Sequence, residues 1–363
     1  MPARLILVGG FLGSGKTTLL WEAAQRLTRQ GHSVGLITND QAPDLVDTAL
    51  LSRSGAGVRE VSGSCFCCNF DGFTDAVKSL MRDEADVIIA EPVGSCTDLS
   101  ATIMQPLKEK HPEIGLAPLT VLVDPGRVRE VLRLAGSSMH TSALYILRCQ
   151  MDEADRIVLN KADTLSDAER VSMLALLTEA FPDRKVRAVS ALSGCGVDDW
   201  LDSVMADTNA GLRVVDVDYD RYAEGEAVLG WLNAVIEFES SVLPAGWGGF
   251  VHGFMQRLHT AFRRKGSEIG HVKIALTCNS REGTANLVRL GGDVALRGFE
   301  GMTGKRASMI LNARVQAPPE DLEAIVRSEV ARSEKEGVSA NVAKLRCLMP
   351  GRPTPTHRYS RTI

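Results

Sequence analysis

The sequence predicts an α/β protein in which a mostly parallel sheet is flanked by helices and is followed by a smaller C-terminal α+β domain. Apolar segments of strand length alternate with helical segments from residue 4 to about residue 205, which is typical of parallel sheets. Beyond residue 227, alternating apolar residues indicate strands that are separated by amphipathic helical segments. The length of 363 residues fits two domains, since a domain takes roughly 150 residues.

Composition and charge exclude several classes of protein. The chain is 44% hydrophobic and 24% charged, which excludes a disordered, collagen-like or coiled-coil chain. A net charge of −4 argues against nucleic-acid binding, which normally rests on a cationic face. No apolar run reaches the roughly 18 residues that cross a bilayer, and the apolar start at Leu5–Val8 has no basic leader. We therefore expect a cytoplasmic protein that binds neither nucleic acid nor membrane.

The N-terminal segment carries the first functional motif. An apolar run at residues 4–8 leads into the pattern G-x-x-x-x-G-K-T at residues 10–17, and residues 18–27 have the apolar spacing of a helix. Glycines let such a loop turn tightly, so that consecutive N–H groups and the helix N-terminus face an anion. Lys16 supplies a catalytic charge for the β- and γ-phosphates, and Thr17 supplies a magnesium ligand, as in the P-loop NTPase fold. The predicted phosphate-binding residues are Gly10, Gly13, Ser14, Gly15, Lys16, Thr17 and Thr18.

A second motif concerns the nucleotide base. The strand-like run at residues 155–159 ends in Asn160-Lys161-Ala-Asp163. A carboxylate here accepts the two donors of guanine, whereas adenine would leave Asp163 unpaired at a cost of about 1–3 kcal/mol. Lys161 can lie along the base, and Asn160 can brace the loops. The pattern therefore predicts GTP rather than ATP. The predicted base-site residues are Asn160, Lys161, Asp163, Ser190 and Ala191.

Two carboxylates follow strand-like segments between these motifs. Asp40 follows residues 33–38, and Glu91 follows residues 86–90. Ligands of parallel sheets lie beyond the carboxyl ends of the strands, so both acids should approach the phosphates. We expect Glu91 in the magnesium shell, Asp40 in that shell or positioning the attacking water, and the Gly94 amide at the γ-phosphate. The alternative for each carboxylate is a helix-capping role.

Three cysteines crowd into four positions at Cys65, Cys67 and Cys68. Thiolates are soft ligands that favour zinc, Cu(I) and other thiophilic ions, and cobalt is admissible because its geometry overlaps with that of zinc. Three sulfurs leave a tetrahedral ion one position short, which favours exchange over permanent binding. Cys96 is either a fourth ligand or a small core residue. A redox role is the alternative for the whole cluster.

Four motifs occur in order over residues 4–205. They are a G-x-L-G-S-G-K-T-T loop, a C-x-C-C element, an E-x-x-G and a Q-x-x-x-A-D-x-I-x-L-N-K-x-D stretch that runs from Gln150 to Asp163. Together they resemble the CobW-type GTPases, P-loop proteins of the metal-chaperone class. The resemblance implies slow, Mg²⁺-dependent GTP hydrolysis coupled to delivery of a metal or metal-bearing cofactor. The recipient would be a client metalloprotein or a corrinoid-dependent enzyme, and Cys65, Cys67 and Cys68 would hold the transferable metal.

Two features depart from that family. Asn39-Asp40-Gln41-Ala42 stands where the family usually shows Asn-Glu-Phe-Gly, and the chain has no histidine-rich tract. Storage of many ions is therefore not expected. Two other functions stay open at this point. One is a small-molecule kinase, which would prefer ATP, and the other is a metal-sensing module with negligible hydrolysis.

The rest of the chain divides into three predicted parts. They are a polar linker at residues 206–226, an α+β domain at 227–335 and a basic, proline-containing tail at 336–363 that is either disordered or a strap docking on a partner. Within the domain, residues 228–238, 272–276 and 307–315 are predicted strands, and segments around 250–262 and 318–330 are predicted helices. The sequence leaves open whether the chain forms a homo-oligomer.

Overall fold

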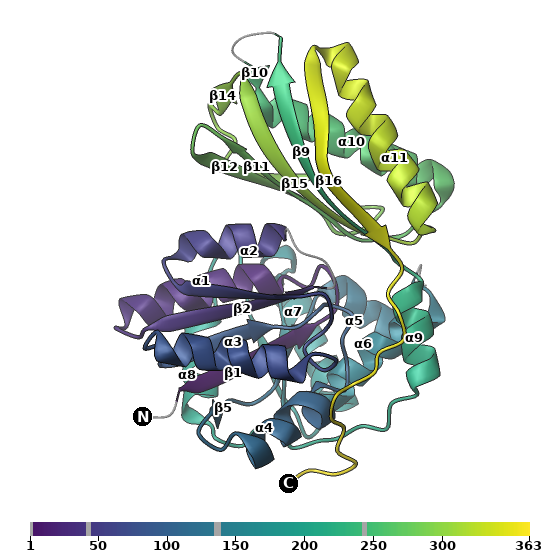
Figure 1. The fold of residues 1–363 in the computed structure, drawn as a ribbon. Coiled ribbons are helices and arrows are strands. Elements are labelled where there is room, and N and C mark those ends of the chain that lie inside the picture. The colour runs from purple at the N-terminus through teal and green to yellow at the C-terminus, as the bar shows by residue number, and fades with distance from the viewer. Residues whose placement is uncertain (1–2, 41–44, 134–138, 242–244) are drawn as a thin grey trace. The chain divides into compact units, whose positions relative to one another are not determined.

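The fold comes from a computed structural model of the chain, which describes residues 3–40, 45–133, 139–241 and 245–363. The chain forms two compact units (Figure 1). Of the described residues, the first unit contains those up to 40, 51–225 and 352–363. The second unit contains residues 45–50 and 226–351. Chain segments that are distant in sequence thus complete each unit.

The first unit is built on a parallel sheet, as the sequence predicts. Its strand order is β3-β2-β4-β1-β6-β7-β8, and the short β5 pairs with β1. The inner strands are buried along their whole length, which is why they appear as continuous apolar runs in the sequence. The strands are β1 Arg4–Gly10, β2 Val34–Asp40, β3 Gly57–Ser62, β4 Val87–Glu91, β5 Gly115–Leu116, β6 Thr120–Val123, β7 Arg156–Leu159 and β8 Lys185–Ala188.

Helices flank this sheet (Figure 1). α1 and α8 pack on one core with β1, β2 and β4, in which Trp200 is fully buried and donates a hydrogen bond from Nε1 to Oγ1 of Thr120 at 3.1 Å. The helices are α1 Lys16–Arg29, α3 Phe70–Arg82, α4 Gln105–Lys110, α5 Pro125–Val131, α6 Thr141–Glu153, α7 Asp167–Ala180, α8 Val197–Ala206 and α9 Tyr219–Ala227. A π-helical turn at Ser100–Met104 leads into α4.

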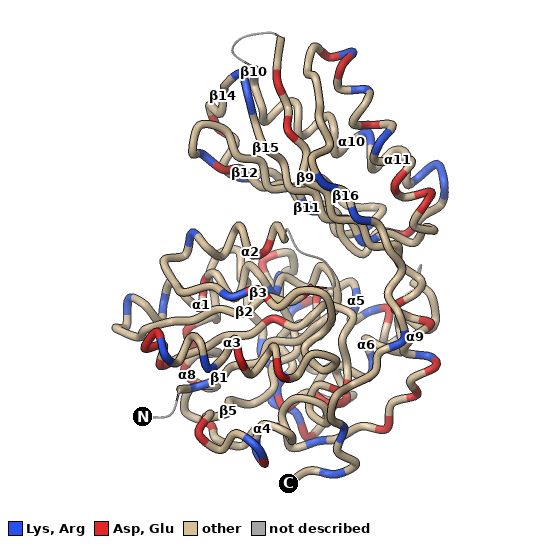
Figure 2. The backbone as a smooth tube through the Cα atoms, viewed as in Figure 1, with Lys and Arg blue, Asp and Glu red and all other residues tan. Residues whose placement is uncertain are grey.

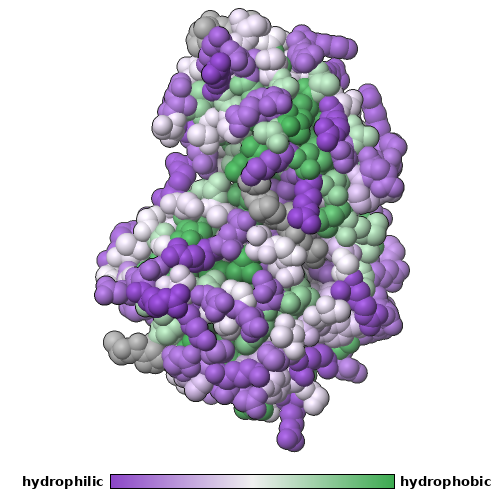
Figure 3. Space-filling view, viewed as in Figure 1, coloured by the Kyte–Doolittle hydropathy of each residue, from purple (hydrophilic) through white to green (hydrophobic). Residues whose placement is uncertain are grey.

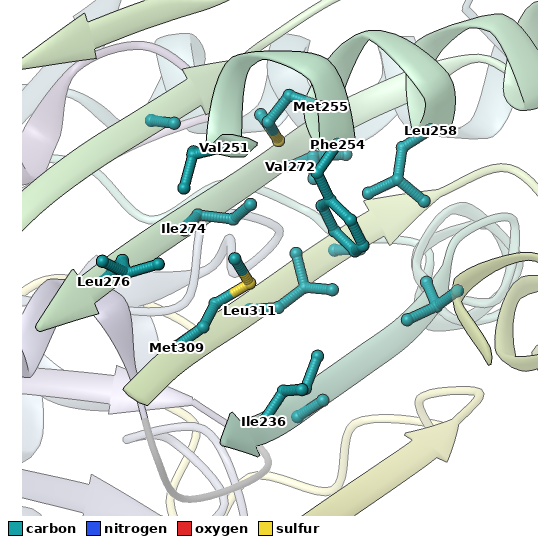
Figure 4. Close-up of a cluster of buried hydrophobic side chains, with 14 of the residues drawn as sticks. Ile236, Val251, Phe254, Met255, Leu258, Val272, Ile274, Leu276, Met309 and Leu311 are labelled. Carbon is teal, nitrogen blue, oxygen red and sulfur yellow. The ribbon is translucent and has the colours of Figure 1, made fainter. Parts of the chain in front are cut away.

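The second unit is a six-stranded sheet with the order β13-β12-β11-β15-β9-β16, covered by two helices. The pairs are antiparallel throughout. Side chains of β9, β11, β15 and α10 interlock in its core (Figure 4). Its elements are α2 Val46–Leu51, β9 Gly230–Ser240, β10 Ala245–Gly246, α10 Trp247–Lys265, β11 Ile269–Cys278, β12 Arg281–Leu287, β13 Ala295–Arg297, β14 Thr303–Gly304, β15 Arg306–Val315, α11 Pro319–Arg332 and β16 Val338–Leu348.

Two predicted boundaries are wrong. Residues 338–348, expected in the tail, form β16, which pairs with β9 as an edge strand. A register shift between Val342 and Lys344 breaks the alternation of its apolar residues, so the sequence pattern concealed the strand. The predicted linker also ends in a helix, α9, because the Asp218 carboxylate accepts the N–H groups of Asp220 and Arg221 at its start.

Charged, polar and apolar residues all contribute to the surface. Charges of both signs are interspersed along the chain (Figure 2), in keeping with the small net charge of −4. Hydrophilic residues predominate on the face shown in Figure 3, and the apolar residues among them gather in a few patches. Within the described ranges, every helix is too short or too polar to span a lipid bilayer.

Candidate functional site

The loop between β1 and α1 has the backbone shape of an anion cradle. Gly10 and Gly15 have φ angles of 131° and 96°, in the region that favours glycine. A Cβ atom at Gly10 would lie 2.4 Å from the carbonyl oxygen of Leu122. One at Gly15 would lie 2.3 Å from Nδ2 of Asn160. Glycine is therefore needed at both positions for close packing as well as for the turn.

Three side chains meet at the end of this loop. Nζ of Lys16 donates a hydrogen bond to the carbonyl oxygen of Gly10 at 2.8 Å and lies 3.8 Å from Oε1 of Glu91. The Thr17 hydroxyl donates to the same carboxylate oxygen at 3.3 Å. All three side chains belong to buried residues. A hydroxyl and a carboxylate are hard oxygen ligands of the kind that Mg²⁺ prefers, so these residues fit the predicted magnesium site.

Asp40 and Gly94 lie near this cluster. Asp40 ends β2, whose neighbour β4 ends in Glu91, and Thr38 is paired with Glu91 between the two strands. Both carboxylates therefore lie at the carboxyl edge of the sheet. A Cβ atom on Gly94 would lie 3.1 Å from Nζ of Lys16, which places the Gly94 backbone against the lysine that is predicted to hold the phosphates.

The predicted base-site residues lie on two loops that Asn160 joins. Its Nδ2 donates to the carbonyl oxygen of Ser14 at 2.7 Å, and its Oδ1 accepts the N–H of Ala191 at 3.0 Å. Ser190 is buried beside Ala191. Lys161 has a left-handed φ of 60°, and Asp163 lies exposed in the short turn that follows it. The bracing of the loops that was expected of Asn160 is thus visible as two hydrogen bonds.

The three cysteines come together in the loop between β3 and α3. The sulfur of Cys65 lies 3.0 Å from that of Cys67 and 3.1 Å from that of Cys68, and the latter two are 3.8 Å apart. The carbonyl oxygen of Cys65 accepts the N–H groups of Cys68 and Asn69, both at 3.0 Å, which curls the loop around the sulfurs. Converging sulfurs of this kind can hold a thiophilic metal ion.

Asn39, whose role the motifs did not reveal, holds this loop from the end of β2. Its Nδ2 donates to the carbonyl oxygens of Val61 and Ser64, both at 2.8 Å, and its Oδ1 accepts the N–H of Phe66 at 2.9 Å. The next residue, Asp40, accepts the Gly63 N–H at 3.1 Å through its carbonyl oxygen. The end of β2 is therefore joined directly to the thiol loop. Gln41 and Ala42, which also depart from the family pattern, lie outside the described residues.

The sulfurs differ in their affinity for protons. Hydrogen bonds from Cys67, Cys68 and Cys96 hold the pKa of Cys65 well below its usual range. The hydrogen bond with Cys65 raises the pKa of Cys67 well above that range and, above all other causes, raises that of Cys68 to about 11. Cys65 is therefore the thiol of the cluster that loses its proton most readily. A metal that binds all three sulfurs must displace protons from the other two.

The chain beyond β16 crosses the same loop. The N–H of Thr356 donates to the carbonyl oxygen of Cys67 at 2.8 Å, and the N–H of Thr354 donates to the sulfur of Cys68 at 3.3 Å. Farther along, Nε of Arg358 lies 2.7 Å from Oδ2 of the buried Asp98. The predicted tail is thus ordered in its last part and docks on the first unit of its own chain.

Glu153, at the end of α6, anchors the segment after Cys96. Its carboxylate accepts the Thr97 hydroxyl at 3.0 Å and the Ser100 N–H at 2.9 Å, and it is fully buried. Burial in this apolar setting raises the pKa of Glu153 to about 8.

This raised pKa predicts how stability depends on pH. Between the usual pKa of 4.5 and about 8, the folded chain keeps a proton that the unfolded chain loses, so this group's contribution to stability falls as pH rises through that window. Glu153→Gln should remove the fall, on the order of 5 kcal/mol, because the amide stays neutral and can still accept the Ser100 N–H. Urea unfolding at several pH values measures how the free energy of unfolding depends on pH, and exposed Glu179→Gln is the control. Parallel pH profiles for wild type and Glu153→Gln would contradict the expectation.

Comparison with known proteins shows which proteins the first unit is similar to. Residues 4–187 match the family described as CobW/HypB/UreG, nucleotide-binding domain. The zinc chaperone YjiA of Escherichia coli strain K12 is 26% identical over 178 residues, which cover 47% of this chain and 52% of YjiA. The zinc chaperone YeiR of the same strain is 30% identical over 163 residues, 44% of this chain and 47% of YeiR. The chain spans about half the length of these curated relatives.

A crystal structure of HypB from Helicobacter pylori in complex with nickel aligns with a TM-score of 0.41 and 17% identity, covering 56% of this chain and 86% of HypB. The family match itself extends over more than half of the 363 residues and contains the phosphate loop, the thiol loop and the Asn160–Asp163 motif. The chain therefore belongs to the CobW/HypB/UreG family, and residues 4–187 are its nucleotide-binding domain.

Proposed function

We propose that this protein is a Mg²⁺-dependent GTPase that carries a thiophilic metal ion on Cys65, Cys67 and Cys68 and delivers it to a client protein. One observation carries the proposal: the thiol loop is tied by hydrogen bonds to Asn39 and Asp40, at the sheet edge that also holds the phosphate site. In GTPases, contacts to the γ-phosphate and Mg²⁺ order such edge loops, and hydrolysis releases them. The nucleotide state would therefore set how tightly the sulfurs hold the ion.

Zinc is the ion that this site fits best, and cobalt is second. Three sulfurs at 3.0–3.8 Å from one another can converge on one tetrahedral ion, for which both metals are suited. The zinc chaperones YjiA and YeiR, by their names, support zinc as the cargo. Thr17 and Glu91 would hold the Mg²⁺, which neutralises charge on the β- and γ-phosphates when it is bound. Asp40 would position the attacking water or complete the magnesium shell.

Guanine selection by Asp163 gives the first test of this account. Asp163→Asn should weaken GTP binding by about 1–3 kcal/mol, or roughly 10- to 100-fold, because an amide NH₂ would face the donors of the base. Titration with GTP and with ATP, monitored by fluorescence or calorimetry, measures the two affinities. Asp167→Asn is the matched control, since the Asp167 side chain is 90% exposed on the following helix. Unchanged GTP affinity in Asp163→Asn would show that the base binds elsewhere.

One experiment separates the proposal from its alternatives. Purified chain is loaded with zinc, its metal content is determined, and GTP and ATP hydrolysis are followed in single turnover. The proposal predicts one zinc per chain, lost on replacement of the three clustered cysteines, and hydrolysis of GTP in preference to ATP. Preference for ATP with transfer to a small acceptor would indicate a kinase instead. Zinc binding without measurable hydrolysis, with or without candidate clients, would indicate a sensor.

A further inference from the structure

Residues 352–363, here termed the strap, form the yellow end of the chain in Figure 1 and belong to the same compact unit as the thiol loop. We propose that the strap covers the face of the thiol loop through which metal enters and leaves, and that metal transfer requires the strap to be displaced. The inference rests on the proposed metal-carrier function and names what controls exchange at that same site.

The sequence of the strap suits it to this contact. Residues 353–356 read Pro-Thr-Pro-Thr, and proline fixes φ and has no N–H group, which favours a stiff, extended backbone. The N–H of Thr354 donates to the sulfur of Cys68 at 3.3 Å. The N–H of Thr356 donates to the carbonyl oxygen of Cys67 at 2.8 Å. Both backbone donors of this stretch are therefore directed at the clustered cysteines.

Side chains of the strap extend the contact. The Thr356 hydroxyl donates to the carbonyl oxygen of Cys68 at 3.4 Å. The ring of His357 meets that of Phe70, the first residue of α3, edge-on with 5.1 Å between the ring centroids. Of the three clustered cysteines, Cys68 is half-buried and the other two are buried. The strap thus lies on the most accessible sulfur of the cluster.

An ion pair to a buried carboxylate anchors the strap beyond the loop. Nε of Arg358 donates to Oδ2 of Asp98 at 2.7 Å. Asp98 is 1% exposed and also accepts the Tyr219 hydroxyl at 2.8 Å. The N–H of Tyr359 donates to the carbonyl oxygen of Ala101 at 3.0 Å. Loss of the guanidinium would leave a buried charge without its partner, so Arg358 should decide whether the strap stays docked.

This anchor lies on the segment that leaves the predicted phosphate site. Asp98 comes four residues after Gly94, whose backbone lies against Nζ of Lys16. Between them, Nε2 of Gln150 donates to the carbonyl oxygens of Gly94 at 3.1 Å and of Cys96 at 2.7 Å. A γ-phosphate that displaces Gly94 would therefore move the anchor through a short, hydrogen-bonded stretch. The strap would then respond to the nucleotide and cover the metal at the same time.

Metal exchange gives the strap its role. A client's ligand must reach the ion while the sulfurs still hold it, which requires an open position on the accessible side of the site. The Thr354 N–H on the sulfur of Cys68 is the kind of outer hydrogen bond that supports a metal-bound thiolate. Undocking of the strap would remove this hydrogen bond and open the path to the ion in one step.

Thiol modification of the full-length, metal-free chain tests the cover. Arg358→Ala should react with a disulfide reagent at the clustered cysteines roughly tenfold faster than wild type, because opening of the strap limits access. Thr356→Pro removes the N–H that Cys67 accepts and should act in the same direction. Peptide mapping identifies the modified cysteines, and a Cys195→Ser background removes an exposed one. Arg361→Ala, at an exposed position of the strap, is the matched control and should react as wild type does.

Zinc transfer and nucleotide dependence provide two further readouts. Zinc-loaded Arg358→Ala should give its metal to a chromophoric chelator roughly tenfold faster than wild type, because the strap no longer holds the path closed. In the wild-type chain, the rate of thiol modification should differ at least about threefold between GDP and a non-hydrolysable GTP analogue. Equal rates with both nucleotides would overturn the connection from the phosphate site to the strap.

The outcomes separate the strap from the carrier function. Wild-type rates of thiol modification in both folded variants would show that the strap is no cover, and faster modification without faster zinc transfer would show that it does not control the metal. Thiol modification needs no metal, so a chain that shows the cover but binds no zinc would overturn the carrier function alone. Thermal melting confirms that each variant is folded, and Thr356→Pro keeps the test decisive if Arg358→Ala unfolds.

Discussion

Lys16→Ala is expected to lower GTP affinity by about 100-fold and hydrolysis by roughly 100- to 1000-fold. Nζ of Lys16 is buried, donates to the carbonyl oxygen of Gly10 and faces Glu91, so it already lies where the phosphates are predicted to bind. Its loss removes the positive charge that would meet the β- and γ-phosphates. No other residue in the sequence motif can replace that charge. Calorimetric titration of GTP and single-turnover hydrolysis measure the two effects.

The control for Lys16→Ala is Lys305→Ala, which removes a lysine whose side chain is 57% exposed in the second unit. This control should bind and hydrolyse GTP as wild type does. Thermal melting confirms that Lys16→Ala remains folded. GTP affinity and hydrolysis within about threefold of wild type in folded Lys16→Ala would place the phosphate site elsewhere in the chain.

Cys65→Ala is expected to weaken zinc binding by at least about 100-fold. Zinc sites with four protein ligands bind with roughly 10–16 kcal/mol, so one thiolate contributes on the order of 3 kcal/mol. Cys65 should contribute at least that much, because its sulfur is the closest to both others and its pKa is held low by their hydrogen bonds. The loop itself is curled by the backbone carbonyl of Cys65, which alanine retains. Competition with a chromophoric zinc chelator measures the affinity.

Cys347→Ser is the matched control for Cys65→Ala. Cys347 is half-buried on β16 in the second unit, and its thiol donates to the carbonyl oxygen of Pro319 at 3.1 Å, a hydrogen bond that serine can also make. The zinc affinity of Cys347→Ser should equal that of wild type. Equal affinities for wild type and Cys65→Ala, or an equal loss in Cys347→Ser, would contradict a site centred on Cys65.

The sequence predicted most of the fold because its strands are patterned locally. β4 and β7 are apolar along their whole length, and both were visible as continuous runs. β9 and β11 carry apolar residues at alternate positions over 232–238 and 272–276, which predicted a strand in each case. β16 was not predicted as a strand, because its register shift interrupts the alternation of apolar residues and arginines follow it closely. The spacing of apolar residues alone cannot reveal a strand whose backbone contains a register shift.

The candidate site could be predicted where its residues share a motif or follow a strand of the parallel sheet. Lys16 and Thr17 share one motif, and the three clustered cysteines occupy four positions, so their chemistry is visible in the sequence. The role of Asn39, by contrast, depends on loops that the sheet brings together. The hydrogen bond from the Thr354 N–H to the sulfur of Cys68 joins residues that are 286 positions apart. Such contacts have no local signal, because packing of the whole unit creates them.

Zinc affinity measured with GDP and with a non-hydrolysable GTP analogue is the most direct test of the coupling between nucleotide and metal. The account predicts that the two affinities differ about fivefold or more, and that zinc changes the preference between the nucleotides by the same factor, because binding linkage is reciprocal. The difference should vanish in Lys16→Ala. Equal zinc affinity in both nucleotide states of the wild-type chain would contradict the account and leave a GTPase domain with an independent metal site.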